Sequence, residues 1–92
     1  MNQELIDFIR KHRALFWYTP EAGLERISDE LLVETILNYG NLEEVSELFR
    51  IIGINKAAET FRGLVGRKKG NYFPEIYNFF NLVFDRYVPT HS

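Results

Sequence analysis

The chain has 92 residues, a formal net charge of −2 and no cysteine. We therefore expect a single domain spanning residues 1–92, and we exclude a disulfide framework, a thiolate nucleophile and Cys-based zinc sites. A composition that is 46% hydrophobic and 15% aromatic can build a small core. No apolar run reaches the roughly 20 residues of a membrane span, and the N-terminus lacks a signal-peptide pattern. These features predict a domain of the reducing cytoplasm that makes no membrane contact.

The first half of the chain has the pattern of two amphipathic helices. Apolar residues recur at helical spacing over about residues 3–17. The helix is expected to end before Pro20, because the residue that precedes a proline avoids the helical region. Ser28 is a good N-cap for the second helix, and Gly40 fits the left-handed position after its end. The buried stripe expected on this second helix comprises Leu32, Val33, Ile36 and Leu37.

Two further helices follow at close spacing. Asn41 and Glu44 have capping-box spacing at the start of a helix over residues 42–52. Asn55 is the expected N-cap of the next helix, which we place over residues 55–66. The inward-facing residues expected on the helix over 42–52 are Leu42, Val45, Leu48, Phe49 and Ile52.

The fifth expected helix is apolar on nearly every side. It begins at Pro74, a residue favoured at the first helical position, and Pro89 stops it. Seven of the fourteen aromatic residues fall between residues 72 and 87, so this helix is either central in the domain or shared with a partner. Residues 89–92 are expected to form a loose tail. The fold class is therefore all-α, a compact single-domain bundle of four or five short helices.

The sequence carries no enzyme signature. Its glycines sit where helix ends need them and form no phosphate-binding loop, and there is no His-Glu-x-x-His motif. His12 lies along the apolar stripe of the first helix, where we expect its ring to pack and a ring nitrogen to find a backbone partner. A catalytic base at His12 would need an orienting acid, and the sequence assigns none. We therefore predict a non-enzyme with no catalytic residue, metal, cofactor or small-molecule substrate.

One enzymatic alternative rests on spacing at the C-terminus. Arg86 and His91 have the Arg-x4-His spacing that resembles the motif of HEPN-type ribonucleases, in which the two residues flank an RNA phosphate. Pro89 breaks the helix between them, and His91 is the penultimate residue. A preorganised RNA-cleaving site is not expected on such a tail.

DNA binding is the main alternative to a protein-binding role. The two helices around Gly53, over 42–52 and 55–66, resemble a helix-turn-helix, although Glu59 and Arg62 occupy positions where that motif prefers apolar residues. Residues 51–92 carry six basic and three acidic residues, which gives this half a positive balance. Glycine-turned helix pairs are also common in bundles, and a basic triplet also complements a helix dipole. The nucleic-acid contacts this hypothesis implies are Lys56, Arg62, Arg67, Lys68 and Lys69.

Protein binding is the favoured function, because the aromatic fifth helix offers more apolar surface than a small core needs. Tyrosine and tryptophan are common anchors in protein interfaces. The alternative for each of these side chains is a place in the core. The predicted interface, with a protein partner or a second copy of the chain, comprises Trp17, Tyr18, Tyr72, Tyr77, Phe80, Phe84 and Tyr87.

The middle of the chain resembles a known family. Leu15-Phe16-Trp17 is followed, after a loop, by an aliphatic helix that ends in Tyr-Gly-Asn-Leu-Glu-Glu-Val at residues 39–45. This pattern, over roughly residues 15–52, is similar to small bacterial all-helical proteins often encoded beside nucleotidyltransferase-type toxins and regarded as antitoxin partners. The sequence departs from the pattern at Tyr18 and through residues 73–84. The resemblance implies a non-enzymatic, partner-binding role in a toxin–antitoxin pair, and it carries over no catalytic residue.

Overall fold

The computed structural model describes residues 3–17, 23, 27–63 and 72–89, and in these ranges the protein is all-α, without a strand. Its elements confirm the predicted compact, single-domain helical bundle. The loose tail expected at 89–92 lies, apart from Pro89, outside the described residues. The elements in order are α1 (Gln3–Lys11), the short 3-10 helix η1 (Arg13–Phe16), α2 (Asp29–Tyr39), α3 (Leu42–Ile52), α4 (Ile54–Arg62) and α5 (Pro74–Tyr87).

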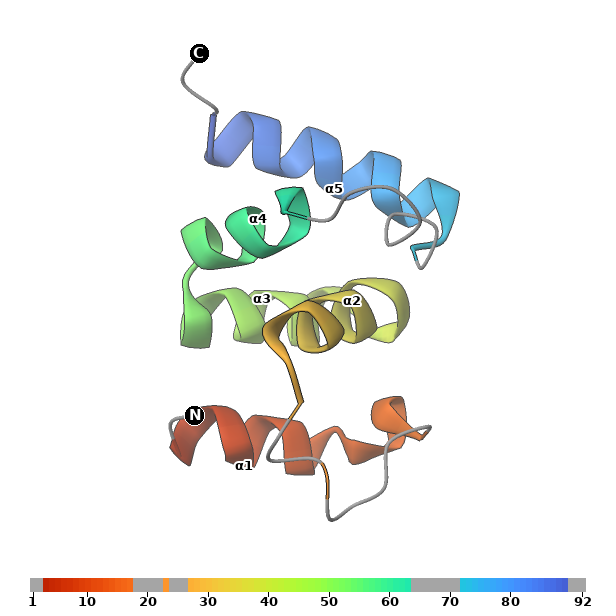
Figure 1. Cartoon of the computed structure of the whole chain (residues 1–92), viewed down its shortest axis with the longest axis vertical. Coiled ribbons are helices and arrows are strands. Elements are labelled where there is room, and N and C mark those ends of the chain that lie inside the picture. Colours follow the sequence, from red (N-terminus) through yellow and green to blue (C-terminus); the bar gives the residue numbers. More distant parts are fainter. Residues whose placement is uncertain (1–2, 18–22, 24–26, 64–71, 90–92) are drawn as a thin grey trace.

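The helices are stacked in layers along the 40 Å long axis of the molecule (Figure 1). α1 forms one end of the stack, α2 and α3 lie in the middle, and α4 and then α5 follow towards the other end. α2 is the central element, because it packs against η1, α3, α4 and α5. Its buried residues include the whole predicted stripe, namely Leu32, Val33, Ile36 and Leu37, together with Thr35.

Local capping chemistry fixes the beginnings of the middle helices, largely as predicted. The Ser28 hydroxyl accepts a hydrogen bond from the Leu31 amide at 3.1 Å. Asn41 and Glu44 form a reciprocal capping box, in which each side chain accepts from the other's backbone amide at 2.8 Å. Pro74 occupies the first turn of α5, as expected.

Two helices have different bounds from those predicted. The first helix is interrupted at His12, whose backbone leaves the helical region at φ −108° and ψ 26°, and the chain continues as η1. The fourth helix begins at Ile54, and its N-cap is Gly53 rather than Asn55, because the positive φ of 88° at Gly53 turns the chain within one residue. α4 ends at Arg62, and the rest of the predicted 55–66 range lies outside the described residues except for Gly63.

Two further expectations at the α2–α3 connection are wrong. Gly40 is extended, at φ −79° and ψ 160°, and not left-handed. A glycine is still required there, because a Cβ atom would lie only 2.7 Å from the carbonyl oxygen of Ile36. Leu42, the first residue of α3, is 72% exposed instead of facing inward.

Within the described ranges, every helix is too short or too polar to cross a bilayer.

Candidate functional site

The inner face of α5 completes the core through an aromatic seam. We use this name for Phe49 of α3, Phe61 of α4, and Tyr72, Tyr77, Phe80 and Phe84 in and before α5. Phe84 lies with its ring centroid 5.7 Å from that of Phe49 and 5.2 Å from that of Phe61. Tyr77 stacks on Phe61 at 5.0 Å. Rings at these separations attract one another beyond the effect of buried area alone, so the seam is the main attachment of α5.

The seam corrects part of the predicted interface. Tyr72, Phe80 and Phe84 are buried in the core, and Tyr77 is half-buried against Phe61. Their side chains cover Phe49 and Phe61, and they present little or no surface to a partner.

The remaining predicted interface residues divide differently. Trp17, which caps η1, is 75% exposed, and Tyr87, at the end of α5, is 63% exposed. Tyr18 lies outside the described residues. Of the six predicted positions that the structure describes, two thus carry a largely exposed aromatic ring.

Sequence reasoning missed five other exposed apolar side chains. Tyr39, at the end of α2, and Phe73, just before α5, are in ring contact, and Leu42 is exposed three residues after Tyr39 at the start of α3. We call these three residues the edge patch. The rings of Tyr39 and Phe73 meet edge to face with centroids 5.5 Å apart, and the Phe73 amide donates to Asn38 Oδ1 at 3.1 Å. The other two, Phe79 and Leu82, lie on the outer face of α5. To predict the exposure of Phe79 and Leu82, one would need to know which side of α5 faces the core, and the apolar residues on both sides of this helix hide that from the sequence.

His12 makes contacts that its sequence context did not indicate. Its Nδ1 lies 2.8 Å from Glu44 Oε2, and its Nε2 lies 3.6 Å from Glu47 Oε1. Both ring nitrogens thus face carboxylates of α3, where a backbone partner was expected. Because Nε2 is also shielded from solvent, it cannot reach a substrate. We assign this polar cluster to the attachment of α1 on α3.

The cations of α4 that DNA binding would need are matched by carboxylates. Lys56 Nζ lies 3.4 Å from Asp29 Oδ2, and Arg62 Nη2 lies 3.5 Å from Asp85 Oδ1. The turn between α3 and α4 is the single residue Gly53, shorter than the three or four residues typical of a helix-turn-helix. The basic triplet Arg67, Lys68 and Lys69 lies outside the described residues.

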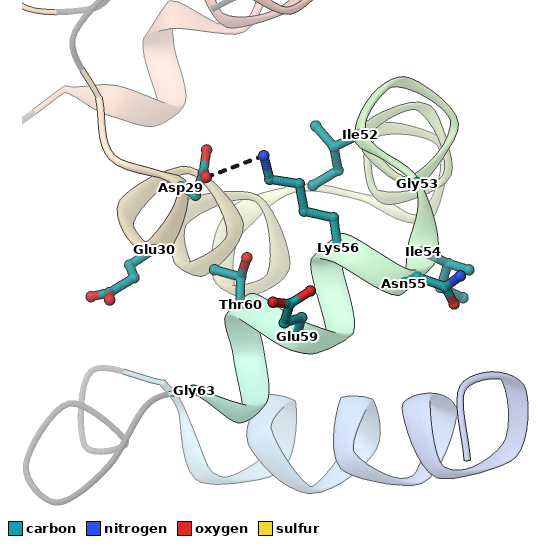
Figure 2. A pocket seen from close by; sticks show the side chains of 10 residues that line it. All are labelled: Asp29, Glu30, Ile52, Gly53, Ile54, Asn55, Lys56, Glu59, Thr60 and Gly63. Carbon is teal, nitrogen blue, oxygen red and sulfur yellow. Dashed lines mark ion pairs between the residues drawn. The ribbon is translucent and has the colours of Figure 1, made fainter. Parts of the chain in front are cut away.

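An open cleft of about 840 Å³ lies between the N-terminal end of α2 and α4 (Figure 2). Lys56 reaches across it to Asp29, and Glu59 and Glu30 also line it. Among the described lining residues, the Lys56 ammonium is already paired with Asp29 and Glu59 adds a further carboxylate, which disfavours the approach of a phosphate backbone. In the part of the chain that the structure describes, no group of three His, Asp or Glu side chains is arranged to hold a metal ion.

The hydroxyl of Tyr72 is a buried titratable group. It is enclosed and finds no hydrogen-bond partner within the described ranges. Burial raises the pKa of Tyr72, and the negative charges of Glu34 and Glu30 raise it further. This hydroxyl therefore stays protonated, and because it is enclosed it offers no chemistry to solvent.

Of the two residues of the Arg-x4-His alternative, the structure describes Arg86. Arg86 is exposed on α5, with its guanidinium carbon 5.8 Å from the centroid of the Tyr87 ring. His91 lies outside the described residues.

A scan against protein-family models gives no match, and neither do searches of curated proteins and of solved structures. The resemblance to antitoxin-like proteins thus stays a prediction, and function has to be inferred from the chain's own residues.

Proposed function

We propose that the protein is a non-catalytic binding module that docks a protein partner on the edge patch. The observation that supports this is the exposure of Tyr39 and Phe73, whose rings are in contact, and of Leu42, which follows three residues after Tyr39. Leu42 alone is 72% exposed. Exposed apolar side chains are ordinary when scattered singly, whereas a contiguous group points to an interaction site.

The edge patch is also preorganised. The ring contact between Tyr39 and Phe73 and the hydrogen bond from the Phe73 amide to Asn38 hold α2 and the start of α5 together. A partner that buries the patch would not have to order these side chains, and less affinity would be lost to conformational entropy. Tyrosine, moreover, combines a large apolar area with a polar end, which suits an interface.

The partner class we propose is the toxin-like protein that the sequence resemblance implies, met in the cytoplasm as the antitoxin-like half of a pair. The polar clusters support a non-enzymatic role, since His12 is held against Glu44 with its Nε2 shielded from solvent, and Lys56 in the α2–α4 cleft is paired with Asp29.

Co-expression with the product of the adjacent gene tests the proposal. We expect a complex that survives size-exclusion chromatography, and a Leu42→Glu variant that loses it because a carboxylate would be buried in an apolar contact. The matched control is Leu82→Glu, since Leu82 is 70% exposed on a different face; it should retain the complex. If no complex survives for the wild type, or if Leu42→Glu binds as tightly, the edge patch is not the docking site.

A further inference from the structure

The outer face of α5 carries an apolar pair with charges placed symmetrically on either side. Glu75, Phe79, Leu82 and Arg86 are all exposed. At 3.6 residues per turn these four lie within about 60° of one another around the helix axis, on a single stripe. α5 is the terminal layer of the stack, and in Figure 1 no other helix covers its outer side. We call this set the α5 stripe.

The order of residues along the α5 stripe is self-complementary. Phe79 and Leu82 lie equally far from the point midway between Phe80 and Asn81, and Glu75 and Arg86 lie equally far from the same point. If a second α5 runs antiparallel across a two-fold axis through that point, each Phe79 meets a Leu82 and each Glu75 meets an Arg86. Such self-complementarity is what an isologous dimer requires.

A parallel pairing would give the opposite result. It would place Glu75 against Glu75 and Arg86 against Arg86, so that both ends of the interface repel. The antiparallel pairing also sets the two helix dipoles in opposition, which is favourable. Charge therefore selects one orientation and one occupant, a second copy of this chain.

The charged members of the α5 stripe are available for such a pairing. In the described part of the chain, neither Glu75 nor Arg86 makes an ion pair, and Arg86 only lies over the Tyr87 ring. By contrast, Asp85, on another side of the same helix, is held by Arg62.

We propose that the protein self-associates as a two-fold symmetric dimer through antiparallel contact of the α5 stripes. One helix face about 16 Å long, from residue 75 to residue 86, is small for an interface. The dimer is therefore weak, and it forms reversibly at high protein concentration. The α5 stripe shares no residue with the edge patch.

Sedimentation equilibrium from about 10 μM to 1 mM, a range suited to a weak dimer, tests the proposal. We expect a reversible monomer–dimer equilibrium for the wild type and at least a tenfold weaker association for Leu82→Glu. Leu42→Glu is the matched control, because Leu42 and Leu82 are exposed to 72% and 70%; it should dimerise like the wild type. A wild type that stays monomeric throughout, or equal losses in both variants, would overturn the proposal.

Charge reversal tests the antiparallel register. Glu75→Arg and Arg86→Glu each turn two attractive pairs of the dimer into repulsive ones, so each alone should weaken association about tenfold or more. The double variant restores opposite charges only if the helices are antiparallel, and it should dimerise again. Circular dichroism confirms that each variant is folded. A double variant as weak as the single ones contradicts the register, whereas the Leu42-dependent partner complex would be unaffected by that result.

Discussion

The two outer layers of the stack, α1 and α5, are attached to the core by different interactions. α1 buries three residues and adds polar contacts to α3, in which Glu4 pairs with Arg50 at 2.9 Å and His12 with Glu44 at 2.8 Å. α5 is attached by the rings of the aromatic seam, with one ion pair between Arg62 and Asp85. α1 is thus oriented by charge and α5 by aromatic packing.

The outer faces of α1 and α5 also differ in polarity. Every exposed residue of α1 is polar or charged, namely Gln3, Glu4, Asp7, Arg10 and Lys11. α5 instead exposes Phe79 and Leu82 in the middle of its outer face. A polar outer layer needs no further cover, whereas an apolar one lowers its free energy when a partner covers it. This difference between α1 and α5 is why the proposed self-association is placed on α5.

The largest expected effect comes from breaking the aromatic seam. Phe84→Ala removes a fully buried ring that contacts Phe49, Phe61 and Phe80. It should lower the free energy of unfolding by about 3–5 kcal/mol, the usual cost of deleting a core phenylalanine. Urea unfolding followed by circular dichroism at low micromolar concentration, where self-association does not contribute, measures the change.

Phe79→Ala is the matched control on the outer face of the same helix. Phe79 is 49% exposed, so its loss should cost less than about 1 kcal/mol under the same conditions. Similar losses for the two variants would contradict the assignment of Phe84 to the core and of Phe79 to the exposed face of α5. If Phe84→Ala does not fold at all, Phe84→Leu provides a smaller loss that can still be measured.

The sequence predicts what depends on neighbouring residues. Ser28, the Asn41–Glu44 capping box and Pro74 were found because a cap is formed within one helical turn. The all-α class and the buried stripe of α2 follow from periodicity for the same reason. Periodicity does not say which positions of a stripe the neighbouring helices cover, so Leu42 was assigned to the core although it is exposed.

The candidate surfaces were harder to predict. In α5 nine of the thirteen residues from 76 to 88 are apolar, so no pattern separates the buried Phe80 and Phe84 from the exposed Phe79 and Leu82. The contact of His12 with Glu44 joins residues far apart in the chain, and no local signal precedes it. Both features are set by tertiary packing, which single-sequence patterns do not encode.

An intermediate effect should follow from releasing α1. Glu44→Ala removes the return bond of the capping box and the 2.8 Å contact with His12 together, and should destabilise the protein by about 1–2 kcal/mol. Glu43→Ala, an exposed carboxylate of the same turn, should change stability by less than about 0.5 kcal/mol. Asn41→Ala breaks the cap but leaves the His12 contact. If Glu44→Ala costs no more than Asn41→Ala in urea unfolding, the contact with His12 does not help to hold α1.

The smallest effect concerns the orphan hydroxyl at the start of the aromatic seam. Tyr72→Phe removes a buried polar atom that lacks a described partner, and we expect a gain of about 1 kcal/mol at neutral pH. The variant should also change how the free energy of unfolding falls at alkaline pH.

Because burial and nearby carboxylates raise the pKa of Tyr72 in the folded state, the unfolded chain releases this proton first, near its ordinary pKa of about 10. Below pH 10 both states hold the proton and stability is unaffected; above it the wild type should lose about 1 kcal/mol more than Tyr72→Phe by pH 11. Tyr39→Phe, on the exposed edge patch, is the control and should retain the steeper wild-type slope. Parallel alkaline limbs for the wild type and Tyr72→Phe would mean that the hydroxyl has a partner or access to water, and that the seam is less tightly closed at Tyr72 than its burial indicates.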